Sequence, residues 1–467
     1  MQQTELTAKI DEYLNKNWDS IVDDIRTLVE IPSFEEPELA SPGQPFGPGP
    51  AAALDKALSI ASDMGFEATN VDGFIGYADF PGKSETQIGI IGHMDVVPAG
   101  PGWTFPPFEV TEKDGYLIGR GTLDDKGPVV IAMHAMKFWK DQGEELPYTI
   151  RFLFGANEET DLRDVEYYRE RYADPAFLFT PDAEFPVCYG EKGGYNGTIT
   201  SEPMPDRVVI EMIGGAATNA VPGEAEATIL INTDDLKSTD KVAVERIDED
   251  RVRLFATGKS AHASMPETGV NAIALIIDYL LENNIGTKKE QDWFKFEKAL
   301  LDNTDGSGVG LKTADKDFGP LTIIGGTVAT ENDCFVQTVD SRYPTSITGE
   351  EIQAILSEQA DKVGASVENT MLLPPFLVSP DSPVIQALLS AYNEATGQNA
   401  KPFTIGGGTY AREFTSGASF GPEMPWIEMP EWVGGMHGPD EGISEDLLKE
   451  AFRIYVLTLD KLMKLDL

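Results

Sequence analysis

The sequence predicts an α/β fold in which a mostly parallel, twisted sheet flanked by helices is interrupted by an inserted α+β domain. Three observations support this prediction. The chain has 467 residues and 41% hydrophobic content, so it can bury a large core, and its length favours more than one domain. Strand-like and helix-like segments alternate in the first 188 residues, which is typical of parallel sheets. Short strand-like segments with polar turns then follow before helical periodicity returns.

The first part of the chain is predicted to alternate between helices and strands. Apolar residues recur at helical spacing over residues 5–30, and a Pro-rich loop leads to a second helix over 52–65. A helix over 128–143 is expected to begin at Pro128 and end at Gly143. The other predicted elements are strands over 86–93, 148–159 and 176–184 and a helix over 165–173.

The middle of the chain predicts a separate domain. Antiparallel strands are expected over 196–203, 207–215, 226–233 and 251–258. We therefore predict one domain from residues 1–188 and 384–467, and an inserted domain from residues 189–383 that is long enough to hold two similar halves. The final part is predicted to contain a helix over 383–397, strand-like segments over 404–409 and 426–435, and a last helix over 445–465.

The charge balance excludes some classes of partner. With 78 Asp and Glu against 36 Lys and Arg, the formal charge is −42, which repels phosphate backbones and anionic membranes. We therefore expect no nucleic-acid and no membrane partner. The acidity suits divalent cations and substrates with a free ammonium group, but solubility or a salty habitat explains it equally well. Cys188 and Cys334 are too few for a disulfide framework, and the N-terminus lacks the pattern of a signal peptide, so a cytoplasmic location is expected.

His93 and Asp95 follow an apolar segment and open a turn. An imidazole and a carboxylate two residues apart suit a metal site, because the carboxylate can orient a ligating ring without using a metal position. A surface His beside a helix-capping Asp would look the same. The interpretation therefore depends on whether further metal-ligand types occur at the ends of similar strands.

Such residues do occur at three further places. Asp124 and Asp125 precede the predicted central helix, and adjacent carboxylates repel each other unless a cation lies beside them, although one Asp capping the helix is the alternative. Glu158 and Glu159 end a predicted strand, where successive side chains point to opposite sides, so one can bind metal while the other serves as a base. Asp182 ends the next strand. Ligands collect at the carboxyl ends of parallel strands.

A second histidine completes a candidate ligand set. His437 follows a glycine pair that allows the backbone to approach a site closely. Two histidines and three carboxylates without a thiolate suit Zn²⁺, with Mn²⁺ or Co²⁺ possible, and this number of ligands favours two ions. His134 lies within an apolar helical segment, and we interpret it as a structural residue.

The motifs IGHMDVVP, GRGTLDDKGP, NEET and TPDAE, together with His437, resemble those of the co-catalytic zinc exopeptidase family. This family includes aminoacylases, desuccinylases, glutamate carboxypeptidases and PepV-type dipeptidases. The resemblance covers nearly the whole chain in order. Many relatives have Asp-Met-Lys-Gly-Gly in the second motif, so the Asp-Asp-Lys-Gly-Pro form, with NEET and the long insert, is most similar to PepV-type dipeptidases.

The resemblance implies a role for each residue of these motifs. His93, Asp182 and Asp124 would bind one zinc ion, and His437, Glu159 and the same Asp124 would bind the other. Asp95 would orient His93, and Glu158 would be the general base for a zinc-bound hydroxide. The peptide bond between Asp124 and Asp125 is expected to be cis.

The resemblance also implies substrate contacts from the inserted domain. His262 is similar to the family residue that polarises the substrate carbonyl, although a turn His next to a serine is the alternative. Arg342 and Asn219 would bind the terminal carboxylate of the substrate, and the segment with Gly407 and Thr409 would add backbone donors and a hydroxyl.

These features predict a dizinc dipeptidase that acts on short peptides with a free N-terminus. An N-acyl amino acid hydrolase on the same scaffold is the nearest alternative, and a carboxypeptidase acting on longer chains is another. A metal-binding protein without turnover is the alternative from another class, but pure binding needs no spare base such as Glu158. In PepV-like enzymes an enlarged lid completes the site within one chain, so a monomer is expected.

Overall fold

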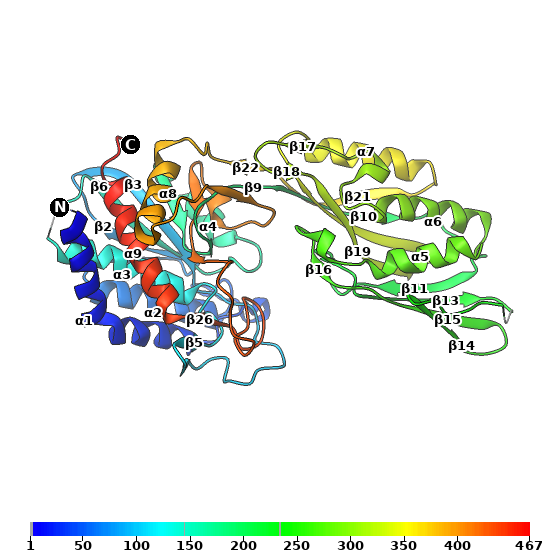
Figure 1. Cartoon of the computed structure of the whole chain (residues 1–467), viewed down its shortest axis with the longest axis horizontal. Coiled ribbons are helices and arrows are strands. Elements are labelled where there is room, and N and C mark those ends of the chain that lie inside the picture. Colours follow the sequence, from blue (N-terminus) through cyan, green and yellow to red (C-terminus); the bar gives the residue numbers. More distant parts are fainter. Residues whose placement is uncertain (1–2, 144, 233–234) are drawn as a thin grey trace. The chain divides into compact units, whose positions relative to one another are not determined.

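The computed structural model describes residues 3–143, 145–232 and 235–467, and the chain forms two compact units (Figure 1). Unit 1 comprises Met1–Tyr189, Leu377–Phe403 and Gly408–Leu467, and unit 2 comprises Gly190–Phe376 and Thr404–Gly407. The segment Thr404–Gly407 therefore belongs to unit 2, whereas the sequence placed it in the first domain. Residue 233, the last of one predicted strand, lies outside the described residues.

The sheet of unit 1 is parallel at its centre and antiparallel at its edges. Seven of its nine strands, in sheet order, are β1 (Glu67–Val71), β2 (Ile75–Phe80), β6 (Tyr148–Gly155), β3 (Ser84–His93), β7 (Phe177–Thr180), β24 (Gly417–Ser419) and β9 (Cys188–Glu191). The pairings β6–β3, β3–β7 and β7–β24 are parallel, whereas β1–β2, β2–β6 and β24–β9 are antiparallel. The predicted α/β sheet flanked by helices is confirmed, and these three parallel pairings join four neighbouring strands.

Six α-helices of unit 1 accompany this sheet in the described part of the chain. They are α1 (Gln3–Val29), α2 (Pro48–Asp63), α3 (Lys126–Asp141), α4 (Arg163–Arg169), α8 (Pro383–Thr396) and α9 (Glu445–Leu462). Short elements that matter for the site are β5 (Tyr116–Ile118), β8 (Ala183–Glu184), β26 (Gly442–Ser444) and the 3₁₀ helix η4 (Tyr410–Glu413).

Several predicted elements differ from the structure in their bounds or type. Helix α3 begins at Lys126 rather than at Pro128, because a proline within the first turn lacks only an N–H that would have no helical partner anyway. The segment 426–435 is not a strand but a series of turns and irregular backbone. Pro430 interrupts this segment and has no N–H to donate to a neighbouring strand.

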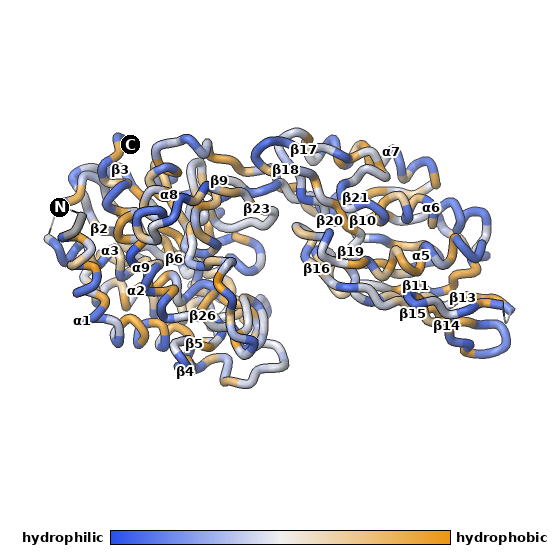
Figure 2. The backbone as a smooth tube through the Cα atoms, viewed as in Figure 1, coloured by the Kyte–Doolittle hydropathy of each residue, from blue (hydrophilic) through white to orange (hydrophobic). Residues whose placement is uncertain are grey.

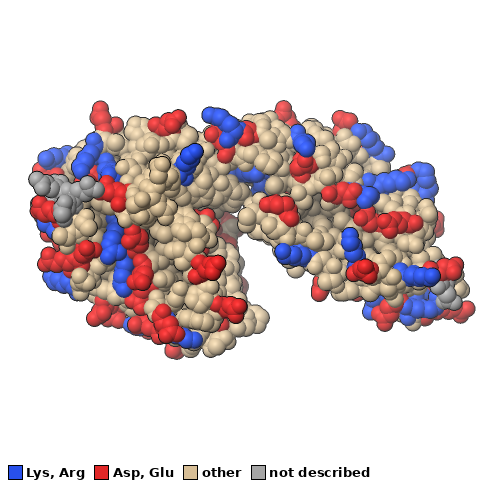
Figure 3. Space-filling view, viewed as in Figure 1, with Lys and Arg blue, Asp and Glu red and all other residues tan. Residues whose placement is uncertain are grey.

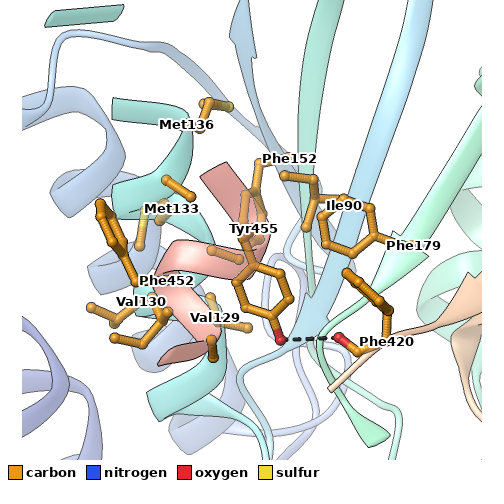
Figure 4. Packing of buried hydrophobic residues seen from close by; sticks show 14 of the residues in the cluster. Ile90, Val129, Val130, Met133, Met136, Phe152, Phe179, Phe420, Phe452 and Tyr455 are labelled. Atoms are coloured by element: carbon orange, nitrogen blue, oxygen red, sulfur yellow. Dashed lines mark hydrogen bonds between the residues drawn. The ribbon is translucent and has the colours of Figure 1, made fainter. Parts of the chain in front are cut away.

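Helices α3 and α9 bury apolar side chains against the central strands. Figure 4 shows Val129 of α3 and Tyr455 of α9 on the side that faces the strands, where Phe179 lies, whereas Phe452 of α9 lies beside α3, farther from the strands. These side chains are all completely buried. The hydroxyl of Tyr455 donates to the Phe420 carbonyl oxygen at 3.0 Å, so this large side chain is buried with its polar atom satisfied. Packing in this core therefore keeps the ends of the central strands in fixed positions, and the site residues lie at these ends.

Unit 2 contains an eight-stranded antiparallel sheet. Its strands, in sheet order, are β14 (Val242–Arg246), β15 (Arg251–Thr257), β13 (Glu224–Leu230), β11 (Val209–Gly214), β19 (Thr322–Glu331), β20 (Cys334–Tyr343), β10 (Gly193–Thr200) and β21 (Ser366–Leu373). Helices α5 (Ala272–Glu282), α6 (Lys288–Leu301) and α7 (Gly349–Asp361) lie on one side of this sheet (Figure 1). Two short strands, β12 (Ala220–Val221) and β16 (Ala261–His262), pair with each other away from the main sheet.

Polar and apolar residues are arranged as the helical periodicity predicts. Figure 2 shows both hydrophilic and hydrophobic residues along α1, and its buried positions include Leu6, Ile10 and Leu14. Acidic side chains, with basic ones among them, occur on the visible face of both units (Figure 3), so on this face the negative charge is not confined to one patch. Among the described residues, no helix combines the length and the apolar character needed to cross a membrane.

Candidate metal centre

The carboxyl ends of β3, β6 and β7 carry the first group of site residues. His93 is the last residue of β3 and pairs with Gly155, the last residue of β6. Asp182 follows the end of β7 by two residues. These strands are neighbours and parallel, so their ends meet at one edge of the sheet, where ligands bind in folds of this class.

Glu158 and Glu159 lie in a turn rather than in an extended strand, which corrects the prediction. Strand β6 ends at Gly155, and residues 158–161 form the turn. The side-chain amide of Asn157 donates to the hydroxyl of Thr160, which holds the turn together. The two carboxylates are therefore not directed by strand alternation, and both reach the edge where His93 lies.

Asp124 lies between the two histidines. Its Oδ1 atom is 2.9 Å from His93 Nε2, and its Oδ2 atom is 3.0 Å from His437 Nε2. The same nitrogen of His437 is 3.0 Å from Glu159 Oε2. The two oxygens of one carboxylate thus face two different imidazoles. The peptide bond between Asp124 and Asp125 is cis, as the resemblance implies.

The remaining acidic residues gather around His93. Its Nε2 atom is 3.7 Å from Asp182 Oδ2. Ligand atoms of His93, Glu158 and Asp182 lie within 4.8 Å of one another, and the same holds for those of His93, Asp124 and Glu159. All five predicted metal ligands are therefore connected through these short distances, and Glu158 lies among them.

Asp95 orients its neighbours through both its backbone and its side chain. The ring nitrogen Nδ1 of His93 is 2.9 Å from the backbone carbonyl oxygen of Asp95 and 3.5 Å from its Oδ1 atom. The carbonyl therefore accepts the Nδ1 proton and leaves Nε2 free to face a metal, which is a common arrangement for a ligating His. The other carboxylate oxygen accepts the N–H of Glu159 at 3.1 Å.

The loop that carries His437 has an unusual backbone conformation. His437 has a φ of 62°, in the left-handed region, and is followed directly by Gly438, while Met436 separates it from the pair Gly434–Gly435. A Cβ atom at Gly434 would lie 2.0 Å from the carbonyl oxygen of Pro439, so only glycine fits there. The glycine pair noted in the sequence is thus partly explained by the tight fold of this loop.

Burial and neighbouring acids raise the pKa values of some acidic groups of the site, whereas hydrogen bonds lower the pKa of another. Burial, reinforced by the charge of Asp124, raises the pKa of Asp182 to about 8. Burial, reinforced by Asp182, also raises the pKa of Glu158 well above its usual value. Hydrogen bonds from His437 and His93 lower the pKa of Asp124 in spite of its burial. Several carboxylates here repel one another and are poorly hydrated, a situation that a bound cation relieves.

The histidines respond to the same charges. Hydrogen bonds to Asp124 and Glu159 raise the pKa of His437 to about 10. Burial lowers the pKa of His93, but hydrogen bonds to Asp124 and Asp95 outweigh burial and raise this pKa well above its usual value. Both rings thus carry protons that hold the carboxylates together, and a cation could replace that positive charge.

The donor set fits divalent cations such as zinc. It offers imidazole nitrogens and carboxylate oxygens, which are zinc ligands, and no thiolate. The Oε1 atom of Glu159 is buried and has no hydrogen-bond partner among the described residues. A buried carboxylate oxygen without a donor is costly, so its position indicates that a ligand other than protein completes the site.

A buried ion pair connects the loops of Asp124 and His437, and the sequence analysis missed it. Arg120 and Glu441 form a salt bridge in which both side chains are almost completely buried. Glu441 Oε1 accepts the backbone N–H of Asp124 at 3.2 Å, and an Arg120 N–H donates to the His437 carbonyl oxygen at 3.2 Å. Arg120 lies in the motif GRGTLDDKGP and Glu441 lies four positions after His437, but only the fold shows that the two side chains meet.

A second buried network supports the turn of Glu158 and was also missed. Asp164 Oδ2 accepts the backbone N–H of Ala156 at 2.7 Å and of Asn157 at 3.0 Å, and it accepts the hydroxyl of Tyr410. The Tyr410 ring also packs edge-on against His93, with ring centroids 6.4 Å apart. One aromatic side chain therefore contacts a candidate ligand and supports the turn that carries the candidate base.

The structure brings three predicted substrate contacts of unit 2 together. Strand pairing places Ala220, next to Asn219, opposite His262, and the backbone oxygen of Asn219 accepts the N–H of Ala263 at 2.9 Å. Arg342 contributes to the charge environment of His262, whose pKa is lowered first by partial burial and then by this guanidinium. His262 and Asn219 are exposed, so their side chains are available to a ligand.

Arg342 is held by two contacts on its own unit. It donates to both carboxylate oxygens of the buried Asp340, at 2.8 and 3.0 Å, and to the Gly406 carbonyl oxygen at 3.2 Å. A guanidinium has five N–H groups, and these contacts use three. Gly407 follows in the same segment of unit 2.

Thr409 and His134 both form hydrogen bonds with other residues of unit 1. Thr409 lies in unit 1, where its hydroxyl accepts the N–H of Ala411 at the start of η4 and lies 2.9 Å from the Ser419 hydroxyl. His134 is buried and hydrogen-bonds Tyr13 at 2.9 Å and Asp24 at 3.0 Å. The interpretation of His134 as a structural residue is confirmed.

An α/β sheet with a histidine and acidic residues at its strand ends, a second histidine on a loop and a carboxylate between the two imidazoles is typical of a metal-dependent hydrolase. The model of Peptidase family M20/M25/M40 matches residues 89–461, which is most of the chain. The chain therefore belongs to this peptidase family and is a hydrolytic enzyme.

Individual relatives agree with this assignment. The chain is 33% identical over 462 residues to a Staphylococcus saprophyticus protein named "Putative dipeptidase SSP1012", covering 95% of this chain and 97% of that one. Its fold is similar to human carnosine dipeptidase 1, with a TM-score of 0.62 at 15% identity over 98% of this chain and 99% of that one. It is also similar to Bacillus subtilis YXEP, described as a dinuclear metal binding peptidase, with a TM-score of 0.52 at 13% identity over 96% and 98% of the two chains.

Proposed function

We propose that this peptidase is a broad-specificity dipeptidase that uses two zinc ions to hydrolyse short peptides with a free N-terminus. The single observation that carries the proposal is the position of Asp124, with one oxygen 2.9 Å from His93 Nε2 and the other 3.0 Å from His437 Nε2. A carboxylate that faces two potential ligand nitrogens from its two oxygens suits a bridge between two metal ions. Mn²⁺ or Co²⁺ would suit the same ligands.

The proposed ligand sets follow from these distances. One ion would be held by His93, Asp182 and Asp124, and the other by His437, Glu159 and Asp124. Both sets combine one imidazole nitrogen with carboxylate oxygens, and Asp95 would keep His93 oriented. Zinc bound in this way supplies an activated water and polarises the carbonyl group of the scissile bond.

Glu158 would be the general base of the reaction. Its carboxylate would accept a proton from the attacking water and later return it to the departing amine. The raised pKa of Glu158 suits both steps, because a carboxylate that holds its proton more strongly is a better base for the attacking water and can still release the proton to the departing amine. The position of Glu158 among the ligand atoms supports this role, since a base must lie within reach of the water.

The groups of unit 2 would bind the substrate. His262 would donate a hydrogen bond to the oxygen of the attacked carbonyl, where negative charge develops. Arg342, which has two N–H groups beyond its three described contacts, and Asn219 would bind the terminal carboxylate. Gly407 of unit 2 and Thr409 of unit 1 would contribute at the same end, and the inserted domain would act as a lid. Relatives named as dipeptidases support peptides as substrates.

We also propose a cellular compartment and an oligomeric state for the protein. The chain has only two cysteines, too few for a disulfide framework, which agrees with a reducing, cytoplasmic compartment. We expect a monomer whose own insert completes the site, and light scattering of the purified protein tests this expectation.

One set of assays tests the proposed function. The zinc-loaded protein is compared on free dipeptides, N-acetylated amino acids and tripeptides, together with Glu158→Ala and the matched control Glu166→Ala, which changes an exposed glutamate. We expect the natural protein to hydrolyse dipeptides. In Glu158→Ala, kcat should fall by about 10² to 10⁴ while the zinc content stays unchanged. Hydrolysis of acylated substrates alone would instead establish an N-acyl amino acid hydrolase. Full activity in zinc-loaded Glu158→Ala would rule out the assigned base.

A further inference from the structure

The loop after β16 contains a hydroxyl that contacts the ring of His262. The Nδ1 atom of His262 is 2.7 Å from the Ser264 hydroxyl oxygen. The backbone N–H of Ser264 also donates to this nitrogen, at 3.2 Å. The hydroxyl and the backbone N–H of Ser264, which lies two positions after His262, therefore both contact the same ring nitrogen.

These contacts determine which ring nitrogen carries the proton. A backbone N–H can only donate, so Nδ1 must present its lone pair to accept it. The Ser264 hydroxyl can donate or accept, and it donates to a nitrogen that has no proton. A neutral imidazole carries one proton, which then lies on Nε2. Partial burial and then Arg342 lower the pKa of His262, with Asp340 acting in the opposite direction, so the neutral form predominates at neutral pH.

The loop is held in place independently of the ring. The buried Ala263 donates its N–H to the Asn219 oxygen at 2.9 Å, and its own carbonyl accepts the Thr322 hydroxyl at 3.1 Å. Gly406 leaves room for Ser264, because a Cβ atom there would lie 2.6 Å from the Ser264 Cβ. The hydroxyl of Ser264 is therefore presented by a fixed backbone, whereas His262 itself is exposed.

We propose that Ser264 is a positioning residue that holds the ring of His262 and keeps its proton on Nε2, so that this nitrogen donates to the substrate carbonyl oxygen. The catalytic consequence rests on the proposed function, but the tautomer does not. If Nδ1 carried the proton and donated to the Ser264 hydroxyl, Nε2 would be an acceptor and would repel the developing negative charge. The two arrangements thus have opposite effects on the reaction.

Nitrogen NMR of the imidazoles tests the tautomer directly. The chain has only four histidines, so ¹⁵N-histidine labelling of the zinc-loaded protein gives few signals, and His262→Gln assigns those of His262. We expect a non-protonated Nδ1 and a protonated Nε2 in the natural protein at neutral pH. Ser264→Ala is expected to shift both signals toward a mixture of tautomers. The control Thr268→Ala, which removes a hydroxyl of the same loop that bonds the Met265 carbonyl oxygen at 2.9 Å, is expected to change neither.

Kinetics test the consequence for catalysis. Ser264→Ala is expected to lower kcat for a dipeptide by about three- to tenfold with little change in KM, because fewer rings are correctly protonated and oriented. Thr268→Ala should retain full activity. A protonated Nδ1 in the natural protein, or Ser264→Ala with unchanged signals, would overturn the proposal. If the tautomer is as expected but the zinc-loaded protein hydrolyses no peptide, only the proposed function fails.

Discussion

The metal centre of unit 1 and the His262 group of unit 2 are held in different ways. Asp124 and His93 are buried, and their backbones are fixed by Glu441 and Asp125, with hydrogen bonds of 3.2 Å each. His262 and Asn219 are exposed and are held mainly by their own short loops. Burial fixes the carboxylates against their mutual repulsion, whereas exposure leaves groups available to a substrate. Changes at the metal centre should therefore affect metal binding, and changes at the His262 group should affect only the reaction.

The largest effect is expected from Asp124→Asn. The amide cannot attract two cations as a carboxylate does, so both ions should bind more weakly and kcat/KM should fall by at least about a thousandfold. Metal analysis after gel filtration and peptide assays measure the two effects. The matched change Asp161→Asn, at an exposed side chain, should alter neither. Retention of two ions in Asp124→Asn would contradict the bridging role.

His262→Ala should separate the two regions. Loss of one hydrogen-bond donor to the developing charge is expected to lower kcat by about 10² to 10³, while zinc content and the melting temperature remain unchanged. Calorimetry and metal analysis, performed on the samples used for kinetics, check this separation. A loss of zinc in this variant would show that His262 also affects metal binding.

A buried carboxylate in unit 2 provides a contrast with those of unit 1. Glu297 is completely buried in α6, and neither of its oxygens has a hydrogen-bond partner among the described residues. Burial raises the pKa of Glu297 to about 8. A carboxyl group with no cation beside it is therefore expected to be neutral at pH 7, whereas a metal would keep those of unit 1 ionised.

This contrast predicts a pH-dependent stability. The folded pKa of Glu297 is above the unfolded value, so the folded state binds the extra proton, and stability falls as pH rises from about 4.5 to about 8. Glu297→Gln cannot lose a proton, so its stability relative to the natural protein should increase by about 3 kcal/mol between pH 5 and pH 8. Urea unfolding of both proteins at several pH values measures this difference. A constant difference would show that Glu297 has an ordinary pKa.

The smallest effect is expected from Tyr410→Phe. This change removes the hydroxyl that donates to Asp164 but keeps the ring against His93, so unfolding should become easier by about 1–3 kcal/mol. Tyr167→Phe is the matched control, because the Tyr167 hydroxyl bonds Asp72 at the surface, at 2.6 Å, and its loss should destabilise the fold much less. Equal losses in both variants would mean that burial does not strengthen the support of the Glu158 turn.

Local patterns in the sequence predicted the candidate ligands but not their supports. His93, Asp124 and Asp182 stand next to strand and helix ends that periodicity reveals, so their common edge follows from a parallel sheet. Arg120 and Glu441 are 321 positions apart, and their pairing leaves no local pattern. The same is true of Asp164 and Tyr410, which are 246 positions apart.

The failures of local prediction also have physical causes. The segment 426–435 has apolar residues suited to a strand, but Pro430 prevents regular pairing, and the chain follows turns instead. Glu158 and Glu159 continue an apolar strand in the sequence, yet bonds from Asp164 and within the turn bend the backbone there. These hydrogen-bond partners lie within eight positions of one another, but side-chain hydrogen bonds leave no periodic pattern in the sequence.

The sequence by itself determined the α/β class, the peptidase family and the identity of the residues that can bind metal, because periodicity and motif chemistry are local properties of the chain. Only the tertiary structure decided which oxygen of Asp124 faces which histidine, that Asp95 orients His93 through its carbonyl, and that Ser264 contacts Nδ1 of His262. Distances and tautomers depend on how segments far apart in sequence pack together, and that packing has no local signal.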